Sequence, residues 1–357
     1  MKKVRVELGA AGYEVRVGMG LLPRVGLWMK ERGFTGRAVI VTDETVKALH
    51  ADALYAGLTN AGFNVALIDI PAGEDRKTLA IAGRLYNKLT DVYAGRTTPV
   101  LALGGGVIGD LAGFVAATYM RGVPLIHVPT TLLAQVDSSI GGKTAVDHGR
   151  LKNIIGAFYQ PRMVIADIET LRTLPPEEIT NGMAEVIKHA AIRDARFFRY
   201  LDASMEKARL LDYGILETIV LENTRIKAEV VEKDEKESGL RAILNYGHTV
   251  GHAIEAVSDF QIKHGYAVAI GMVAAARIAS YMNILNVDEV DRLEALIKEA
   301  GLPVRMPDVD IGKVIRAMKH DKKVLDEKLR FVLLRSIGHA FVTDEVSQAL
   351  VEEVLVG

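Results

Sequence analysis

The chain of 357 residues contains no cysteine. This excludes disulfide bonds, thiolate metal ligands and a cysteine nucleophile. The chain also lacks a net charge of either sign, because 44 Lys and Arg face 45 Asp and Glu and leave a formal charge of −1. A protein with almost no net charge has no overall positive electrostatic field to attract nucleic acid or an anionic membrane, and we expect neither as a partner. An anionic ligand requires a local cluster of basic side chains.

Long apolar runs are missing as well. The first ten residues lack the apolar core of a signal peptide. The most apolar segment, residues 267–282, is interrupted by Arg277 and is shorter than the roughly 20 residues that span a bilayer. We therefore expect a cytoplasmic protein. With 49% hydrophobic and 25% charged residues, the composition is that of a globular chain long enough for two domains.

The first half of the chain alternates short apolar runs with stretches of helical period, such as 45–61 and 78–92. This pattern predicts a mostly parallel, buried sheet of an α/β domain. Residues 4–8 and 13–17 flank a glycine-containing turn and predict an opening hairpin. The buried runs are residues 38–41, 65–70, 99–103, 125–128 and 163–166.

After Pro175 and Pro176 helical periods dominate, and a late pair of runs predicts a small hairpin at 330–334 and 339–342. We predict a Rossmann-like α/β domain over residues 1–174 and a mainly α-helical domain over 175–357. A cleft between two such domains is a natural ligand site. The predicted helices cover residues 196–211, 215–236, 267–282, 287–300 and 311–320.

A glycine-rich segment, Gly104 to Asp110, follows one apolar run and opens a helical pattern. It matches G-x-G-x-x-G, in which glycines let the backbone approach a pyrophosphate at a helix N-terminus. The acidic residue expected about 20 residues later is absent, so the standard dinucleotide fingerprint is incomplete. Acidic groups for a ribose lie upstream at Asp43, Glu44 and Glu74. The alternative is a strand–helix turn without a ligand.

Residues 137–144 resemble a phosphate loop at first sight, but Asp137 stands where a Walker A motif has its first glycine. A glycine-flanked Lys143 still suits an anion. Lys152 and Asn153 follow closely. Taken singly, each lysine is better explained as a solvated surface charge.

Histidines gather late in the chain. His248 and His252 are four residues apart and share one face of a predicted helix, and His264 follows. Imidazoles are common ligands of zinc, and a catalytic zinc site takes three protein ligands. Upstream, Glu185 shares a helix face with Lys188 and His189. Glu185 is thus either a ligand or an ion-pair partner, and local spacing leaves the ligand set open.

Taken together, these segments resemble the 3-dehydroquinate synthase family over nearly the whole chain. Tyr266 stands where the family usually has Glu. The matching segments are residues 71–78, 104–113, 129–144, 182–188, 240–255 and 264–265.

The resemblance implies a reaction on 3-deoxy-D-arabino-heptulosonate 7-phosphate, a sugar acid with a carboxylate and a phosphate. NAD⁺ oxidises the C5 hydroxyl, phosphate is eliminated beside the new ketone, and the NADH just formed reduces the ketone again. Ring opening and an intramolecular aldol step then give 3-dehydroquinate. The implied cofactors are NAD and one divalent metal, Zn or Co. The enzyme is then a phosphate lyase with a redox cofactor.

The resemblance also assigns residues. The metal ligands are Glu185, His248 and His264, with His252 behind them or acting as a proton relay. Arg121 would reach into the neighbouring subunit of a homodimer. Lys322, or its neighbour Lys323, would bind phosphate. The other implied catalytic and substrate-binding residues are Asp137, Lys188, Lys227, Asn245, Lys143, Lys152, Asn153 and Arg241. The implied cofactor set is Asp43, Glu74, Lys77, Gly105, Gly106, Val107, Asp110, Thr130, Thr131, Lys143, Lys152 and Thr170.

Three other functions compete. A sibling cyclase makes a different carbocycle, such as 2-deoxy-scyllo-inosose or a valiolone, and differs in the residues that meet the substrate carboxylate. A metal-dependent glycerol or glycerol-1-phosphate dehydrogenase needs fewer cations. A nucleotide-binding regulatory protein would not need the metal ligands. The full basic set favours the dehydroquinate reaction.

Overall fold

The computed structural model describes residues 1–149, 151–237, 239–323 and 329–356, without the side chains of residues 319–323. The chain forms two compact units. The first comprises Met1–Pro175 and Leu216–Lys236, and the second Pro176–Ile215 and Glu237–Gly357. The domain boundary near residue 174 stays a prediction, because a compact unit need not be an independently folding domain.

A seven-stranded sheet forms the centre of the first unit in the described part of the chain, in the order β1-β2-β9-β6-β5-β3-β4. All neighbouring pairs are parallel except β1 with β2. The sequence prediction of an opening hairpin and a buried parallel sheet is thus confirmed. The strands are β1 (Lys2–Val6), β2 (Tyr13–Gly18), β3 (Arg37–Asp43), β4 (Asn64–Ile70), β5 (Val100–Gly104), β6 (Leu125–Pro129) and β9 (Met163–Asp167).

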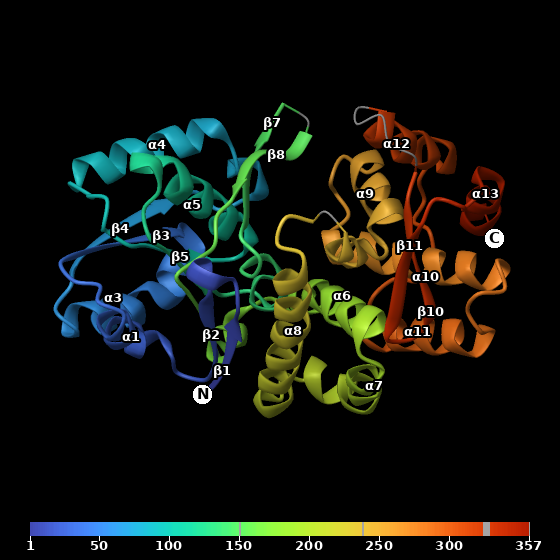
Figure 1. Ribbon diagram of the computed structural model, residues 1–357, viewed down its shortest axis with the longest axis horizontal. Coiled ribbons are helices and arrows are strands. Elements are labelled where there is room, and N and C mark those ends of the chain that lie inside the picture. The colour runs from blue at the N-terminus through green and yellow to red at the C-terminus, as the bar shows by residue number, and fades with distance from the viewer. Residues whose placement is uncertain (150, 238, 324–328, 357) are drawn as a thin grey trace. The chain divides into compact units, whose positions relative to one another are not determined.

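Alternate side chains of the central strands feed two cores. Val39 and Val41 of β3 pack with residues of α4 and α5, whereas Ala38 and Ile40 pack with residues of α1 and α3. Because successive side chains of a strand point to opposite faces, helices cover both faces of the sheet (Figure 1). The helices of this unit are α1 (Val25–Glu31), α2 (Glu44–Val46), α3 (Asp52–Asn60), α4 (Leu79–Asp91), α5 (Gly106–Thr118) and most of α8 (Tyr213–Lys233).

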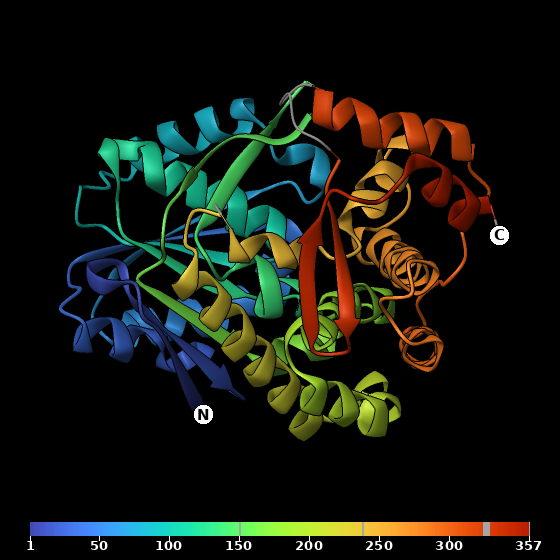
Figure 2. The same ribbon diagram turned by 45° about the vertical axis from the view of Figure 1, so that its right-hand side comes forward.

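A second antiparallel hairpin in the first unit was not predicted. It pairs β7 (Lys143–His148) with β8 (Leu151–Phe158). Lys143 therefore begins a strand and does not lie in a phosphate loop. β7 packs beside α5, and Figure 2 shows the hairpin as a long ribbon next to that helix. The turn before it contains η6 (Ala134–Ser138), which carries Asp137.

The second unit is mainly helical, as predicted. Its elements pack around α10, which contacts α6, α9, α11 and the hairpin of β10 and β11. Among the described residues, no helix has both the length and the apolar composition needed to cross a bilayer. The elements are α6 (Pro176–Arg193), α7 (Ala195–Arg209), α9 (His248–Val257), α10 (His264–Tyr281), α11 (Val287–Glu299), α12 (Ile311–Lys323), α13 (Gln348–Val356), β10 (Phe331–Ser336) and β11 (His339–Thr343).

Candidate active site

The residues predicted to hold the cofactor lie at one edge of the sheet. Asp43 ends β3, Gly104 ends β5 and Thr130 follows β6. The strand order reverses between β3 and β5, because β4 lies beyond β3 and β6 lies beyond β5. In open parallel sheets, ligands bind outside the carboxyl ends of the strands at such a switch point. Glu74 and Lys77 come after β4, and Thr170 after β9, so their strands end at the same edge.

The glycine-rich segment forms the turn from β5 into α5. Gly105 is the N-cap of this helix and Gly106 its first residue. A Cβ atom on Gly106 would lie 3.3 Å from Ser138 Oγ, and one on Gly105 would lie 3.0 Å from Thr131 Cγ2. Because Gly105 and Gly106 have no side chains, their own residues do not cover the backbone amides at the start of α5. They can meet an anion, which the helix dipole favours at this position.

A charged cluster lies beside this turn. Lys77 is 4% exposed, and its ammonium group donates hydrogen bonds to Asp110 and to Asn153 Oδ1. Burial alone would lower the pKa of Lys77, but the charge and hydrogen bond of Asp110 outweigh burial and raise it. Lys152 Nζ lies 3.6 Å from Glu74 Oε1. Predicted cofactor-binding and substrate-binding residues are thus intermixed in one network.

A second buried pair joins Asp137 to Lys227. Lys227 Nζ donates to Asp137 Oδ1 at 2.6 Å and to the carbonyl oxygen of Asp137 at 2.7 Å. Lys227 lies on α8, far along the chain, and is 5% exposed. The two predicted catalytic residues therefore form one fixed ion pair within the first unit.

In the second unit, three side chains from three helices converge. Glu185 belongs to α6, His248 is the first residue of α9 and His264 is the first residue of α10. Glu185 Oε1 lies 3.7 Å from His248 Nε2 and 3.6 Å from His264 Nε2. These separations exceed the usual 2.7–3.2 Å of an N–H···O hydrogen bond. They are close to the roughly 3.4 Å between two ligands that each lie about 2.1 Å from one tetrahedral ion.

The other ring nitrogen of each histidine has its own acceptor. His248 Nδ1 lies 3.1 Å from the carbonyl oxygen of Tyr246, and His264 Nδ1 lies 3.2 Å from Glu255 Oε2. An N–H at Nδ1 satisfies both acceptors and leaves the Nε2 atoms facing Glu185. One carboxylate and two imidazole nitrogens, all within 4.8 Å of one another, form a donor set suited to a divalent metal.

The charges around this cluster act differently on the two histidines. Burial, and then the positive charge of Lys188, hold the pKa of His248 well below its ordinary value. Burial would also lower the pKa of His264, but the carboxylates of Glu185 and Glu255 raise it to about 10. His248 is therefore neutral, and without a metal His264 carries a second proton, whose place at Nε2 a divalent ion would take.

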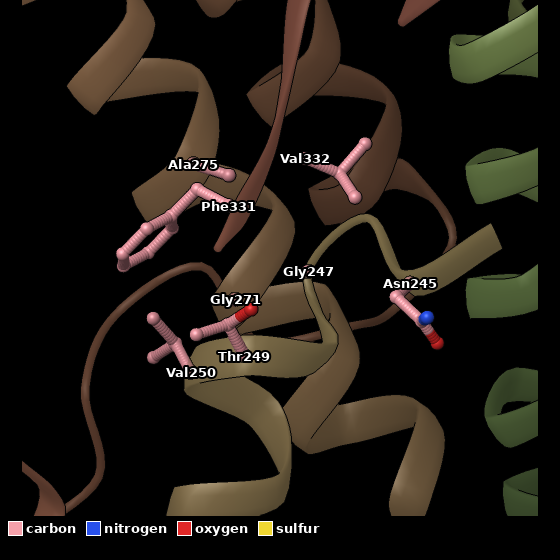
Figure 3. A pocket seen from close by; sticks show the side chains of 8 residues that line it. All are labelled: Asn245, Gly247, Thr249, Val250, Gly271, Ala275, Phe331 and Val332. Atoms are coloured by element: carbon pink, nitrogen blue, oxygen red, sulfur yellow. The ribbon is translucent and has the colours of Figure 1, made fainter. Parts of the chain in front are cut away.

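Close backbone contacts hold α9 against α10. Gly247 precedes α9 with φ +79°, and a Cβ atom on Gly271 of α10 would lie 1.9 Å from the carbonyl oxygen of Gly247. No other residue type fits at position 271 without moving the helix. The turn, α10 and β10 line a small pocket that includes Asn245, Thr249 and Phe331 (Figure 3). Glycine thus sets the approach of α9 to α10 and the spacing of His248 and His264.

The remaining predicted residues of the second unit lie around this cluster. Lys188 is buried and forms an ion pair with Glu185 Oε2, and His189 Nε2 lies 3.9 Å from the same atom. His252 is exposed, and its ring centroid lies 5.0 Å from that of His248. Arg241 is 1% exposed.

Four other predicted residues lie in different parts of the chain. Asn245 Nδ2 donates to Glu237 Oε1 at 3.0 Å within the second unit. Arg121 lies in the first unit on an exposed turn. The side chains of Lys322 and Lys323 lie outside the described residues.

No role was predicted for Glu255 or Glu237. Glu255 lies three residues after His252 and seven after His248, so helical spacing places it on the side of α9 that carries the histidines. That spacing is the signal from which its contact with His264 could have been found. Glu237 has no comparable local signal, since it reaches Asn245 from outside any helix.

Comparison with known proteins bears on the whole chain. A family model described as the N-terminal part of 3-dehydroquinate synthase matches residues 67–181, and one described as the C-terminal part matches residues 182–324. A curated 3-dehydroquinate synthase of Desulforamulus reducens is 49% identical over 357 residues, covering 99% of each chain.

Two solved structures share the fold. A 2-deoxy-scyllo-inosose synthase complexed with carbaglucose-6-phosphate, NAD⁺ and Co²⁺ superposes with a TM-score of 0.90 at 29% identity, covering 99% of both chains. A 2-epi-5-epi-valiolone synthase from Streptomyces hygroscopicus with NAD⁺ and Zn²⁺ bound has a TM-score of 0.90 at 28% identity, covering 98% of this chain and 96% of the other. The two family models together span most of the chain, and the curated relative matches almost all of it. The chain therefore belongs to the 3-dehydroquinate synthase family.

Proposed function

We propose that this chain converts 3-deoxy-D-arabino-heptulosonate 7-phosphate to 3-dehydroquinate and phosphate, as a carbon–oxygen lyase that uses NAD and a divalent metal. The observation that carries the proposal is the cluster of Glu185, His248 and His264 in a chain that is 49% identical to a 3-dehydroquinate synthase over its full length. Similarity to two cyclases of other carbocycles is lower, at 28–29%.

Glu185, His248 and His264 would hold the metal, either Zn²⁺ or Co²⁺. When bound, the ion lowers the pKa of the substrate hydroxyls it meets and polarises the transient ketone. Lys188 places a buried ammonium group against Glu185 and adds a positive charge beside the reacting oxygens. His252, exposed beside His248, would relay protons from the solvent.

NAD would bind at the carboxyl edge of the parallel sheet. The amides at Gly105, Gly106 and Val107 would meet the pyrophosphate, and Asp43, Glu74 and Lys77 the adenosine end. Support comes from the strand-order reversal between β3 and β5, where such sheets bind nucleotides. Lys77 fixes Asp110 in the first turns of α5. Other contacts would come from Asp110, Thr130, Thr131, Lys143, Lys152 and Thr170.

The two negative groups of the substrate need cations. Arg241, Lys152 and Asn153 would bind them, together with Lys143 and Lys322. Arg241 suits this role because it is a buried guanidinium, 1% exposed, and guanidinium groups bind carboxylates and phosphates through charge-assisted hydrogen bonds. Lys227 and Asp137 would act as a fixed pair in the substrate site, in which the lysine ammonium donates a hydrogen bond to the carboxylate.

Arg121 would act in the active site of a second copy in a homodimer. Its turn supports an unusual role, since Met120 has φ +50°, Arg121 has φ +65° and both side chains are exposed. Non-glycine residues in this region cost about 1–3 kcal/mol each and tend to occur at functional sites.

Mixing inactive Arg121→Ala and inactive His264→Ala chains tests whether Arg121 acts in the active site of the second subunit. In a mixed dimer one site regains an intact metal cluster and an intact arginine, so activity should return. If subunits exchange and no activity returns, Arg121 does not act across an interface.

One assay tests the reaction itself. The protein is incubated with the heptulosonate phosphate, a catalytic amount of NAD⁺ and Zn²⁺ or Co²⁺, and phosphate and NADH are measured. The proposal requires phosphate release without net NADH. Stoichiometric NADH would identify a dehydrogenase instead, and turnover only with a different sugar phosphate would identify a sibling cyclase.

A further inference from the structure

His264 is the least enclosed member of the proposed metal cluster. It is the first residue of α10, after Lys263 with extended backbone (φ −62°, ψ 146°). Its side chain is 30% exposed, whereas that of His248 is 12% and that of Glu185 is 1% exposed. A partly exposed ring at a helix start is not held by packing alone. Its orientation depends on specific contacts.

Glu255 supplies such a contact. It lies on α9, its side chain is 7% exposed, and its Oε2 atom lies 3.2 Å from His264 Nδ1. A carboxylate only accepts hydrogen bonds, so the contact favours a proton on Nδ1. The Nε2 atom, which a metal ion would bind in place of a proton, then faces Glu185 Oε1 at 3.6 Å. One hydrogen bond thus sets both the tautomer and the ring plane of His264.

A second arrangement of these residues is less consistent with the distances. His252, Glu255 and His264 also place ligand atoms within 4.8 Å of one another, which a second ion would require. The separation of 3.2 Å between His264 Nδ1 and Glu255 Oε2 is, however, a hydrogen-bond distance. His252 is also exposed, unlike the buried Glu255.

We propose that Glu255 is a positioning residue, which holds the Nε2 atom of His264 toward the metal and does not itself bind the ion. The inference rests on the proposed metal site. It deepens that site by naming the residue on which the third ligand depends. Carboxylates that accept the second N–H of a metal-bound histidine typically contribute about 10–100-fold in metal affinity.

The test measures Zn²⁺ affinity of the full-length protein by competition with a chromogenic chelator. Glu255→Ala should bind Zn²⁺ about 10–100-fold more weakly. Glu255→Gln should stay close to the unchanged protein, because its amide oxygen still accepts from Nδ1. Glu294→Ala is the matched control, since Glu294 is a partly buried, ion-paired glutamate of the same unit that contacts Arg277 and Lys298.

A second readout follows coordination directly. The visible spectrum of the Co²⁺-loaded protein should change in Glu255→Ala and be restored in Glu255→Gln. Thermal unfolding of the metal-free variants shows whether they fold. If Glu255→Ala does not fold, Glu255→Asp takes its place. It keeps the charge but withdraws the oxygen from Nδ1, and it should also weaken Zn²⁺ binding at least about tenfold.

Three results would overturn the proposal: unchanged Zn²⁺ affinity in folded Glu255→Ala, an equal loss in Glu255→Gln, or a fall from two bound Zn²⁺ to one. The last would make Glu255 a ligand of a second ion. His264→Ala separates this proposal from the metal site beneath it. If His264→Ala binds Zn²⁺ normally, the assignment of the metal site fails, whatever Glu255 does.

Discussion

The candidate site of the first unit is formed by loops at strand ends, and that of the second unit is formed by side chains on packed helices. In the first unit, the predicted cofactor residues come from loops that follow β3, β4, β5, β6 and β9, and sheet topology alone brings them to one edge. In the second, three side chains converge from α6, α9 and α10, and close backbone contacts at glycines fix their spacing. The first site is a property of strand order, and the second is a property of helix packing.

This difference implies different tolerance to change. A nucleotide is held by many weak contacts, so the loss of one is graded. A metal requires ligand distances within about 0.2 Å of their ideal values, so the loss of one ligand, or a small shift of α10, removes the site. The comparison therefore predicts that the two binding functions can be destroyed separately.

The largest effect is expected for His264→Ala. It removes one of the three proposed metal ligands and should abolish both bound metal and activity, while NAD⁺ binding, which we propose for the first unit, persists. Metal content by atomic absorption and NAD⁺ binding by calorimetry check both parts. Full metal content would show that His264 is not a metal ligand. Loss of NAD⁺ binding would show that the two binding functions are not independent.

The reciprocal change is Gly106→Val. A side chain at this position meets Ser138 and covers the amides at the start of α5, so NAD⁺ binding should fall sharply while Zn²⁺ binding stays. Gly83→Val is the control, because a Cβ atom there, on α4 of the same unit, meets nothing within 4 Å. NAD⁺ binding that is equally strong in both variants would contradict the proposed cofactor site.

A third change should affect neither cofactor. Loss of one charge-assisted hydrogen bond to a buried anion costs about 1.5–3 kcal/mol, or roughly 10–150-fold in affinity. Arg241→Ala should weaken substrate binding by this amount and leave NAD⁺ and metal almost unchanged. Arg316→Ala, on an exposed arginine of the same unit, serves as control. Substrate affinity measured by calorimetry decides the outcome, and equal affinity of the two variants would remove Arg241 from the substrate site.

The smallest expected effect concerns stability, through His127 on β6. Burial lowers the pKa of His127 to about 4, from 6.5. Between these values the unfolded chain binds a proton that the folded chain does not, so this contribution to stability is complete above pH 6.5 and is lost as the pH falls. Each pH unit below 6.5 costs about 1.4 kcal/mol.

Between pH 7 and pH 5.5, the free energy of unfolding of the unchanged protein should therefore fall by about 1.4 kcal/mol more than that of His127→Gln. Thermal unfolding at both pH values measures the difference, and His339→Gln, on exposed β11, is the control. The same loss in both variants would show that His127 is not the titrating group.

Local patterns in the sequence predicted the parts that depend on local physics. Period-two and period-3.6 hydrophobicity placed the sheet strands and most helices, and glycine spacing located the turn into α5. The β7–β8 hairpin was missed, because glycines and a lysine at 141–143 also suit an anion loop. Spacing alone left the ligand set open, since the approach of His264 depends on how α10 packs against α9, which no local pattern encodes.

The first unit is discontinuous in sequence, because Leu216–Lys236 joins it after a segment of the second unit has intervened. During synthesis, the lysine that pairs with Asp137 is thus not yet made when β9 is complete. Chain growth at about 5–20 residues per second leaves the unit without its last helix for several seconds. The final form of the first unit is therefore set by a part of the chain that is translated late, and a fragment ending at Pro175 would lack it permanently.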